Sequence, residues 1–192
     1  MMKINGAYTF QNANFARKNQ YTENKNNESA EDLYKLFIYE LKEMYWSEMI
    51  MVKALAKVIK NTSDIYLIQL LKLNLDITKY QIIRIEELFV MLDEKIASKR
   101  CEPLKEMLVE INEYIKYYEK GQFKDEIMMQ NLQKIAQFKI DSYNSFFEYA
   151  RSIGEYEVAA FILESLNEEI ELDSKLAEMM DSTINSNISA YY

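Results

Sequence analysis

The chain of 192 residues contains no histidine, one cysteine, one proline and three glycines. Without histidine it cannot carry serine or cysteine triads with a histidine base, zincin-type zinc sites, or the Glu-x-x-His ligand pairs of typical di-iron bundles. Chains rich in strands and tight turns need more glycine and proline than this, whereas residues that favour helices are abundant here. The sequence therefore predicts an all-α protein.

Charge and apolar patterning exclude further classes of function. The formal net charge is −8, and nucleic-acid binding usually needs a concentrated basic face, so we expect no nucleic-acid partner. No stretch approaches the ~20 uncharged apolar residues of a membrane span, and residues 1–27 lack the compact apolar region of a signal peptide. Because Cys101 cannot form an intrachain disulfide, no oxidising compartment is needed. These features favour a cytoplasmic protein without a membrane partner.

Hydrophobic periodicity predicts a single helical domain at residues 29–181, between a flexible N-terminal arm (1–28) and a flexible tail (182–192). Five helices are expected, at about residues 30–60, 63–94, 103–120, 123–153 and 156–180. Four are long, and the short one lies between the second and fourth. This order predicts a ferritin-like four-helix bundle with a short extra helix in its long crossover.

Residue types near the expected helix ends agree with these limits. Ser29 and Ser63 suit the caps that begin the first and second helices. Pro103 suits the first turn of the third helix, and Gly121 fits as the residue that ends it. Gly154 is expected to end the fourth helix.

Each long helix carries one polar residue near the middle of its apolar stripe. These are Glu48, Thr78, Lys139 and Glu169. The stripe of the second helix passes through Leu75 or Asn74 and then through Ile82. If the four stripes face one another, the polar residues share one layer of the core. An isolated buried charge is very costly, so this layer must balance its charges.

Two interpretations of the layer remain open. In the first, Lys139 forms a salt bridge with Glu48 or Glu169, and a buried ion-pair network results. In the second, carboxylates alone bind iron or manganese, as in metal-binding bundles. If the stripes shift by one position, four carboxylates that otherwise suit the polar flank of a helix would point into the core. They are Glu40, Asp76, Asp141 and Glu168. Asp76 and Asp141 are the weaker candidate metal ligands beside Glu48 and Glu169.

The first two helices carry an apolar surface, here called the apolar arc, that is wider than one helix–helix contact within the bundle would bury. It comprises Tyr34, Ile38, Tyr45, Met49 and Val52, then Tyr66, Leu70, Leu73 and Ile77. Either the N-terminal arm and the third helix cover it, or it forms the interface of a homodimer, which we favour. A protein partner that binds the arc or the arm is a further alternative.

The sequence resembles the YciF/YciE-type ferritin-like family, bacterial proteins tied to stress responses whose biochemical role is unknown. The resemblance covers residues 33–180 and lies in the order and spacing of several short motifs. They are Leu36-Phe37, Glu40-Leu41, Tyr45-Trp46-Ser47-Glu48, Thr78, Arg84-Ile85-Glu86, Phe89, Cys101-Glu102, Leu163-Glu164, Leu166, Glu168-Glu169, Asp173 and Leu176. It implies a ferritin-like bundle, often dimeric, with a di-metal centre to which Glu48 and Glu169 would belong.

The chain departs from the family at the other positions of that centre. Asn74 stands where a histidine is expected, and Ile77 stands at an acidic position. The expected Glu-His-x-Glu pattern reads Ala136-Gln137-Phe138-Lys139. We therefore expect a non-enzymatic, stress-associated bundle protein with a degenerate di-metal site, no catalytic residues and no cofactor. A carboxylate-only iron or manganese protein or oxidase is the alternative.

Overall fold

The computed structural model describes the backbone of residues 7–189 and the side chains of residues 31–182. In this part of the chain all regular structure is helical, which confirms the predicted all-α class. The five helices are α1 (Ala7–Asn61), α2 (Ile65–Met91), α3 (Glu102–Tyr117), α4 (Gln122–Ser152) and α5 (Tyr156–Ser189). Within the described residues, no helix combines the length and the apolar character needed to cross a bilayer.

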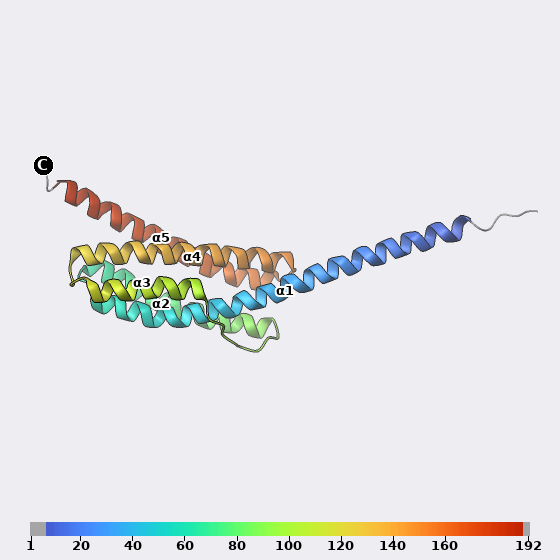
Figure 1. The fold of residues 1–192 in the computed structure, drawn as a ribbon, viewed down its shortest axis with the longest axis horizontal. Coiled ribbons are helices and arrows are strands. Elements are labelled where there is room, and N and C mark those ends of the chain that lie inside the picture. Colours follow the sequence, from blue (N-terminus) through green and yellow to red (C-terminus); the bar gives the residue numbers. More distant parts are fainter. Residues whose placement is uncertain (1–6, 190–192) are drawn as a thin grey trace, which may run out of the picture.

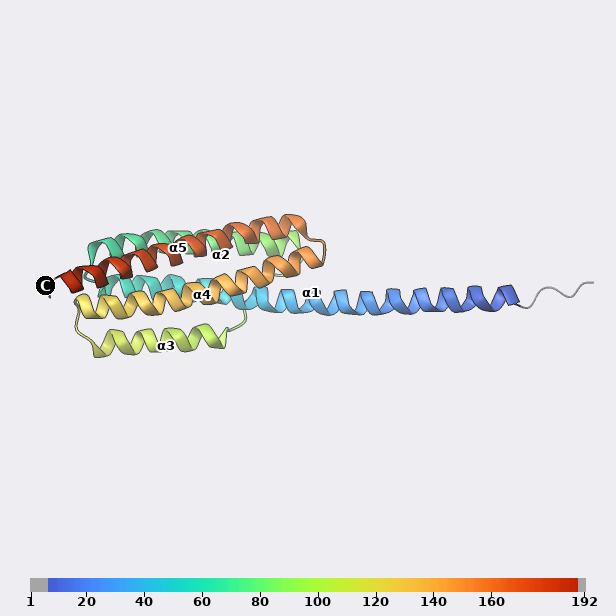
Figure 2. The same ribbon diagram turned by 90° about the horizontal axis from the view of Figure 1, so that it is seen from above.

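The four long helices form a bundle built from two hairpins. Helices α1 and α2 make one hairpin and α4 and α5 the other, with α1 beside α4 and α2 beside α5 (Figure 1). The segment between α2 and α4 runs along the bundle and includes α3, which packs outside the bundle against α4 and α1 (Figure 2). The predicted ferritin-like topology, with a short helix in the long crossover, is therefore correct.

Helix α1 begins much earlier than predicted. It runs from Ala7 through Ser29 without a break, so Ser29 is not an N-cap, and residues 7–28, expected to be a flexible arm, are helical. The N-terminal part of α1 extends beyond the bundle as a single helix (Figures 1 and 2). Residues 7–29 contain no glycine or proline, and extending an existing helix costs much less than nucleating one. For the same reason α5 continues to Ser189, into the segment expected to be a tail. Residues 1–6 and 190–192 lie outside the description.

The cap of α2 also differs from the prediction. Asp64, not Ser63, is the N-cap, and its carboxylate accepts a hydrogen bond of 2.8 Å from the backbone N–H of Leu67. A second carboxylate reaches this turn from α4. Asp125 accepts hydrogen bonds from the backbone N–H groups of Ser63 (3.0 Å) and Asp64 (2.8 Å). The first turn of α2 therefore receives two carboxylates, which also favours its position relative to α4.

The two internal glycines have different roles. Gly154 has a φ of 87° and follows the C-terminal turn of α4, as expected, and the N–H of Glu155 bonds to the carbonyl of Ala150 at 2.9 Å. Gly121 does not end α3, which already stops at Tyr117; it is the N-cap of α4. Pro103 lies in the first turn of α3, as predicted.

The apolar core consists of two clusters on either side of a polar layer. One cluster includes Leu55, Leu71 and Leu132, and the other includes Phe37, Phe89 and Phe146. In α2 the buried stripe contains Asn74 and Gln81, not Leu75 and Ile82. The sequence left the choice between Leu75 and Asn74 open, but the prediction of Ile82 was wrong, because spacings of three and four residues both suit a helix. The correction matters because it brings Gln81 into the polar layer.

Candidate functional site

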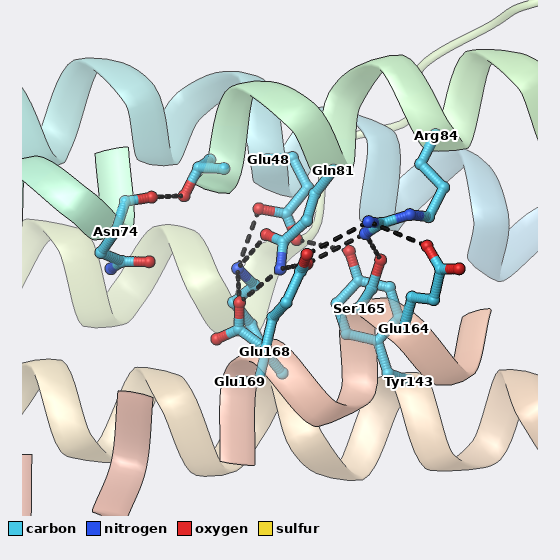
Figure 3. A network of polar contacts seen from close by, with 11 residues as sticks. Glu48, Asn74, Gln81, Arg84, Tyr143, Glu164, Ser165, Glu168 and Glu169 are labelled. Carbon is cyan, nitrogen blue, oxygen red and sulfur yellow. Dashed lines mark hydrogen bonds and ion pairs between the residues drawn. The ribbon is translucent and has the colours of Figure 1, made fainter. Parts of the chain in front are cut away.

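Each long helix contributes one polar side chain to the centre of the bundle. Glu48 comes from α1, Gln81 from α2, Lys139 from α4 and Glu169 from α5, and all four are buried. Figure 3 shows Glu48, Gln81 and Glu169 pointing toward one another. The flanking turns of each helix carry apolar residues that belong to the two core clusters. The apolar stripe therefore fixes the helix, and its single polar position aims a functional group at the bundle axis.

Lys139 is the hub of this layer. Its ammonium nitrogen lies 2.6 Å from Oε1 of Glu169 and 2.9 Å from Oε2 of Glu48. It also donates a hydrogen bond of 3.2 Å to Oε1 of Gln81. The exposed fraction of each charged side chain is 2% or less. The ammonium therefore donates hydrogen bonds to Glu169 and Gln81 and forms an ion pair with Glu48, so it has partners on three different helices.

The two carboxylates have further partners. The hydroxyl of Tyr143 donates to Oε1 of Glu48 at 2.8 Å, and Nε2 of Gln81 donates to Oε1 of Glu169 at 3.0 Å. Oε2 of Glu169 and Oε2 of Glu48 are buried and accept no hydrogen bond from the described residues, although the latter forms the ion pair with Lys139. One ammonium and two carboxylates would leave a net charge of −1 in the core, which is costly in a medium of low dielectric constant.

This environment shifts three pKa values. Burial raises the pKa of Glu48, with a further contribution from Glu169, and the ammonium of Lys139 only partly opposes the shift. Burial lowers the pKa of Lys139, but attraction to the two carboxylates outweighs it, so the net shift is upward. The pKa of Tyr143 is well above its usual value because of burial and then because of the nearby charge of Glu48.

A second network links the buried layer to the surface. The guanidinium of Arg84 makes two hydrogen bonds to the carboxylate of Glu168, at 2.9 and 3.1 Å, and a third of 2.6 Å to the hydroxyl of Ser165. It also forms an ion pair of 3.2 Å with the exposed Glu164. Gln81 joins the two networks, because its Nε2 lies 3.1 Å from Glu168 (Figure 3). Such two-pronged arginine pairs fix geometry as well as charge.

Only some of the residues that the sequence analysis singled out lie in the buried layer. The structure brings Glu48, Lys139 and Glu169 together. Thr78 is buried nearby, but its hydroxyl donates to the carbonyl of Asn74, one turn earlier in α2, at 2.9 Å. Asp76 is exposed and pairs with Lys79 at 2.7 Å.

The remaining acidic candidates lie outside the buried layer. Asp141 is exposed on α4 and Glu40 is half-buried on α1. Both line a surface cavity between α1 and α4. Glu168 belongs to the Arg84 network instead.

Sequence reasoning missed Gln81, Arg84 and the polar role of Tyr143. Gln81 could have been found from alternating steps of four and three residues through Asn74, Thr78, Gln81 and Ile85. The partners of Arg84 lie more than 80 residues away, in α5, so no local pattern indicates them. Tyr143 fits an apolar stripe equally well with or without a role for its hydroxyl.

The residues of the layer do not fit a di-metal centre. The ammonium of Lys139 occupies the position between Glu48 and Glu169 where a cation would have to lie. No group of three or more cysteine, aspartate or glutamate side chains within the described residues is placed to hold a metal ion. The charge that a metal would supply in such a bundle is here partly supplied by an amine of the protein.

The topology and the charged layer define the class: an all-α, ferritin-like four-helix bundle with a buried lysine between carboxylates. The chain belongs to the family described as a domain of unknown function, DUF892, whose model matches residues 32–189. Protein YciF from Escherichia coli (strain K12) is 30% identical over 151 residues, which are 78% of this chain and 91% of YciF. These matches confirm the resemblance to YciF-type proteins.

Solved structures agree with this assignment. The crystal structure of the E. coli stress protein YciF has a TM-score of 0.76 and 29% identity, covering 80% of this chain and 97% of YciF. YcfI from Rhodopseudomonas palustris has a TM-score of 0.73 and 26% identity, covering 76% of this chain and 92% of YcfI. A protein from Xanthomonas campestris pv. campestris shares the fold, with a TM-score of 0.66 and 16% identity. The match covers 83% of this chain and 98% of the Xanthomonas chain.

Proposed function

We propose that this protein is a non-enzymatic bundle protein in which a buried Glu/Lys network replaces a di-metal site. The observation that carries the proposal is the position of the Lys139 ammonium, which lies within 3 Å of both Glu48 and Glu169. Two carboxylates at that distance hold an ammonium in place, and Gln81 accepts a further hydrogen bond from it. A layer of this kind favours one register of the helices over others.

A role in stress responses forms the second part of the proposal. It is supported by the similarity to YciF, which is described as a stress protein in E. coli, and by the family to which both chains belong. We also place the protein in the cytoplasm, since its one cysteine, Cys101, is buried and free and needs no oxidising compartment. Its task would then be structural or one of protein interaction.

Metal loading tests the first part of the proposal. The purified protein is incubated with Fe²⁺ or Mn²⁺, desalted and analysed for metal content. We expect no stoichiometric metal in the wild-type protein, and equal residual metal in wild type and in the Glu48→Ala and Glu169→Ala variants. Stoichiometric metal that disappears in both variants would overturn the proposal.

One observation favours the alternative of a carboxylate-only iron or manganese protein. Oε2 of Glu169 is buried and has no hydrogen-bond partner in the described part of the chain, and a hard cation is a natural partner for such an oxygen. Binding of this kind would require Lys139 to move out of the layer. The same loading experiment with the wild-type protein distinguishes the two functions. Consumption of dissolved O₂ after addition of Fe²⁺ would reveal an oxidase.

We further propose a homodimer through the face formed by α1 and α2. On α2, Tyr66 and Leu73 remain exposed at 71% and 49%, and a contiguous exposed apolar patch would suit an interface. The two tyrosines of α1 are engaged inside the chain instead. Tyr34 donates a hydrogen bond to Glu94, just after the end of α2, and Tyr45 donates one to Glu86, within α2. The apolar part of the interface would therefore lie on α2.

Sedimentation analysis tests the dimer. The wild-type protein should have the mass of two chains, and Leu73→Glu should yield monomers because it buries a charge in the interface. Ile170→Glu, at an exposed apolar position on α5, is the matched control and should remain dimeric. A monomeric wild-type protein, or a dimer that survives Leu73→Glu unchanged, would contradict the proposal.

A further inference from the structure

A groove between α1 and α3 differs from the rest of the surface in its charge. Helix α3 lies outside the four-helix bundle, beside α1 (Figure 2), and the two helices touch only lightly. The groove between them has a cavity volume of about 280 Å³, close to the lower limit of the sites that bind small molecules. It lies on the outer face of α1, away from the Lys139 layer.

The floor of the groove is apolar. Trp46 and Ile50 contribute from α1, and Leu108 and Val109 from α3. Trp46 and Ile50 are partly buried against the core, whereas 47% of Val109 is exposed. A tryptophan beside aliphatic side chains offers a flat surface for a ring or a short alkyl chain.

All charged residues that line the groove are lysines. Lys53 and Lys57 project from successive turns of α1, and Lys105 comes from α3. Among the residues that the structure describes, no carboxylate lines it, although the whole chain carries a net charge of −8. Three ammonium groups around one concave surface repel one another, and an anion in the groove would relieve that repulsion.

The three lysines are only partly engaged by the protein itself. Lys57 donates to the side-chain oxygen of Asn112, and Lys105 forms an exposed ion pair of 3.4 Å with Glu102. Within the described part of the chain, Lys53 has neither an ion pair nor a hydrogen bond through its ammonium. Exposed pairs such as Lys105–Glu102 contribute little stability, so an incoming anion can compete for both groups.

We propose that the α1–α3 groove binds a small amphipathic anion, with a carboxylate or phosphate head and a short apolar or aromatic body. The head lies between Lys53, Lys57 and Lys105, and the body rests on Trp46. The apolar floor and the all-cationic rim together specify this chemical class, because each half of the site matches one half of the ligand. The volume limits the ligand to a small molecule, so a folded partner would not fit inside the groove.

Titration of tryptophan fluorescence tests this proposal directly, because Trp46 is the only tryptophan of the chain. The full-length protein is titrated with octanoate, octyl phosphate and octanol in separate experiments. We expect saturable changes with one or both anions, much weaker binding of the neutral alcohol, and weaker anion binding at high salt. The two anions distinguish a carboxylate ligand from a phosphate ligand.

Charge-reversal variants show whether the groove is the binding site. Lys53→Glu should weaken anion binding at least about tenfold, because it removes one charged donor and adds repulsion. Lys72→Glu, at an exposed position on α2, makes the same charge change away from the groove and should bind as the wild type does. Circular dichroism checks that both variants fold. Equal affinity of both variants, equal affinity for octanol and octanoate, or no saturable change would overturn the proposal.

Discussion

The ammonium of Lys139 lies 2.6 Å from a carboxylate oxygen of Glu169, inside a core from which both side chains have almost no access to solvent. The second carboxylate, that of Glu48, is 2.9 Å away on a third helix. A buried ion pair seldom stabilises a protein more than apolar side chains of the same shape would, but losing one partner is very costly. The cost of a substitution in this layer should therefore depend on whether it leaves a buried charge without a partner.

Replacing Lys139 with methionine should be strongly destabilising. The change preserves most of the side-chain volume but leaves two buried carboxylates without a cation, so we expect a loss of about 3–5 kcal/mol in the free energy of unfolding. Urea denaturation followed by circular dichroism measures it. Lys72→Met, at an exposed position, is the control and should change stability by less than about 0.5 kcal/mol. Equal effects of the two substitutions would mean that Lys139 does not hold the layer together.

Neutralising Glu48 should be much milder. Glu48→Gln keeps an acceptor for Tyr143 and leaves one ammonium paired with one carboxylate, so the expected cost near neutral pH is below about 1.5 kcal/mol. Burial raises the folded-state pKa of Glu48 above its unfolded value. Its contribution to stability is therefore full below the unfolded pKa, near 4.3, and is lost as pH rises through the folded pKa.

The variant lacks this pH-dependent loss. The difference in unfolding free energy between wild type and Glu48→Gln should thus shrink, or change sign, as the pH rises from about 4 to 8. Urea denaturation across this range provides the measurement. A constant difference would show that the pKa of Glu48 is the same in the folded and unfolded states.

Tyr143 should determine part of the alkaline stability. Its folded-state pKa is raised well above the usual value near 10, chiefly by burial. The unfolded chain therefore releases this proton first, and stability falls as pH rises above about 10. The raised pKa of Lys139 acts in the same direction.

Tyr143→Phe should separate the two contributions. Near neutral pH it should cost about 1.5–3 kcal/mol, because it removes the donor that faces the Glu48 carboxylate. Above about pH 10 its stability should fall less steeply than that of the wild type. Urea denaturation at several alkaline pH values tests this, and parallel curves for the two proteins would contradict the assignment to Tyr143.

The turn between α1 and α2 should depend on a residue of α4. Asp125 accepts from the backbone N–H groups of Ser63 and Asp64, at the start of α2. Asp125→Ala removes this cap and should cost about 1–2 kcal/mol. Asp141→Ala, at an exposed position on the same helix, is the control. If thermal melting shifts equally for both, the capping role is wrong.

The sequence predicted the parts of the fold that depend on local patterns. Glu48, Lys139 and Glu169 stand out because a charge interrupts an apolar stripe, and such an interruption needs no knowledge of the neighbours. Gln81 was missed because Ile82 offered an equally good helical spacing and a more apolar side chain. The choice between the two depends on which face of α2 meets the other helices, and that is a tertiary property.

Contacts between segments that lie far apart in the chain could not be predicted from local sequence patterns. Arg84 bonds to Glu168 across 84 residues, and Asp125 bonds to Ser63 across 62. In a sequence, both residues are typical of a solvated helix surface. The predicted start at Ser29 was wrong for a different reason. A serine followed by an acidic first turn is a cap only where the preceding residues leave the helix, and nothing in residues 7–28 forces them to do so.

Substituting Lys139 with glutamate should create the metal site that the wild-type layer does not fit. Lys139→Glu would place a third carboxylate with Glu48 and Glu169, on three separate helices, which is the ligand type that bundles use for iron and manganese. Without metal, three mutually repelling buried carboxylates should destabilise the protein at least as much as Lys139→Met. With Mn²⁺, binding to the folded state alone should raise the Tm in proportion to the logarithm of the metal concentration. Lys139→Gln, which is uncharged, is the matched control and should show no such rise. If Mn²⁺ stabilises neither variant, or both equally, then the helices around Lys139 are not arranged to bind a cation, and the layer owes its geometry to the amine alone.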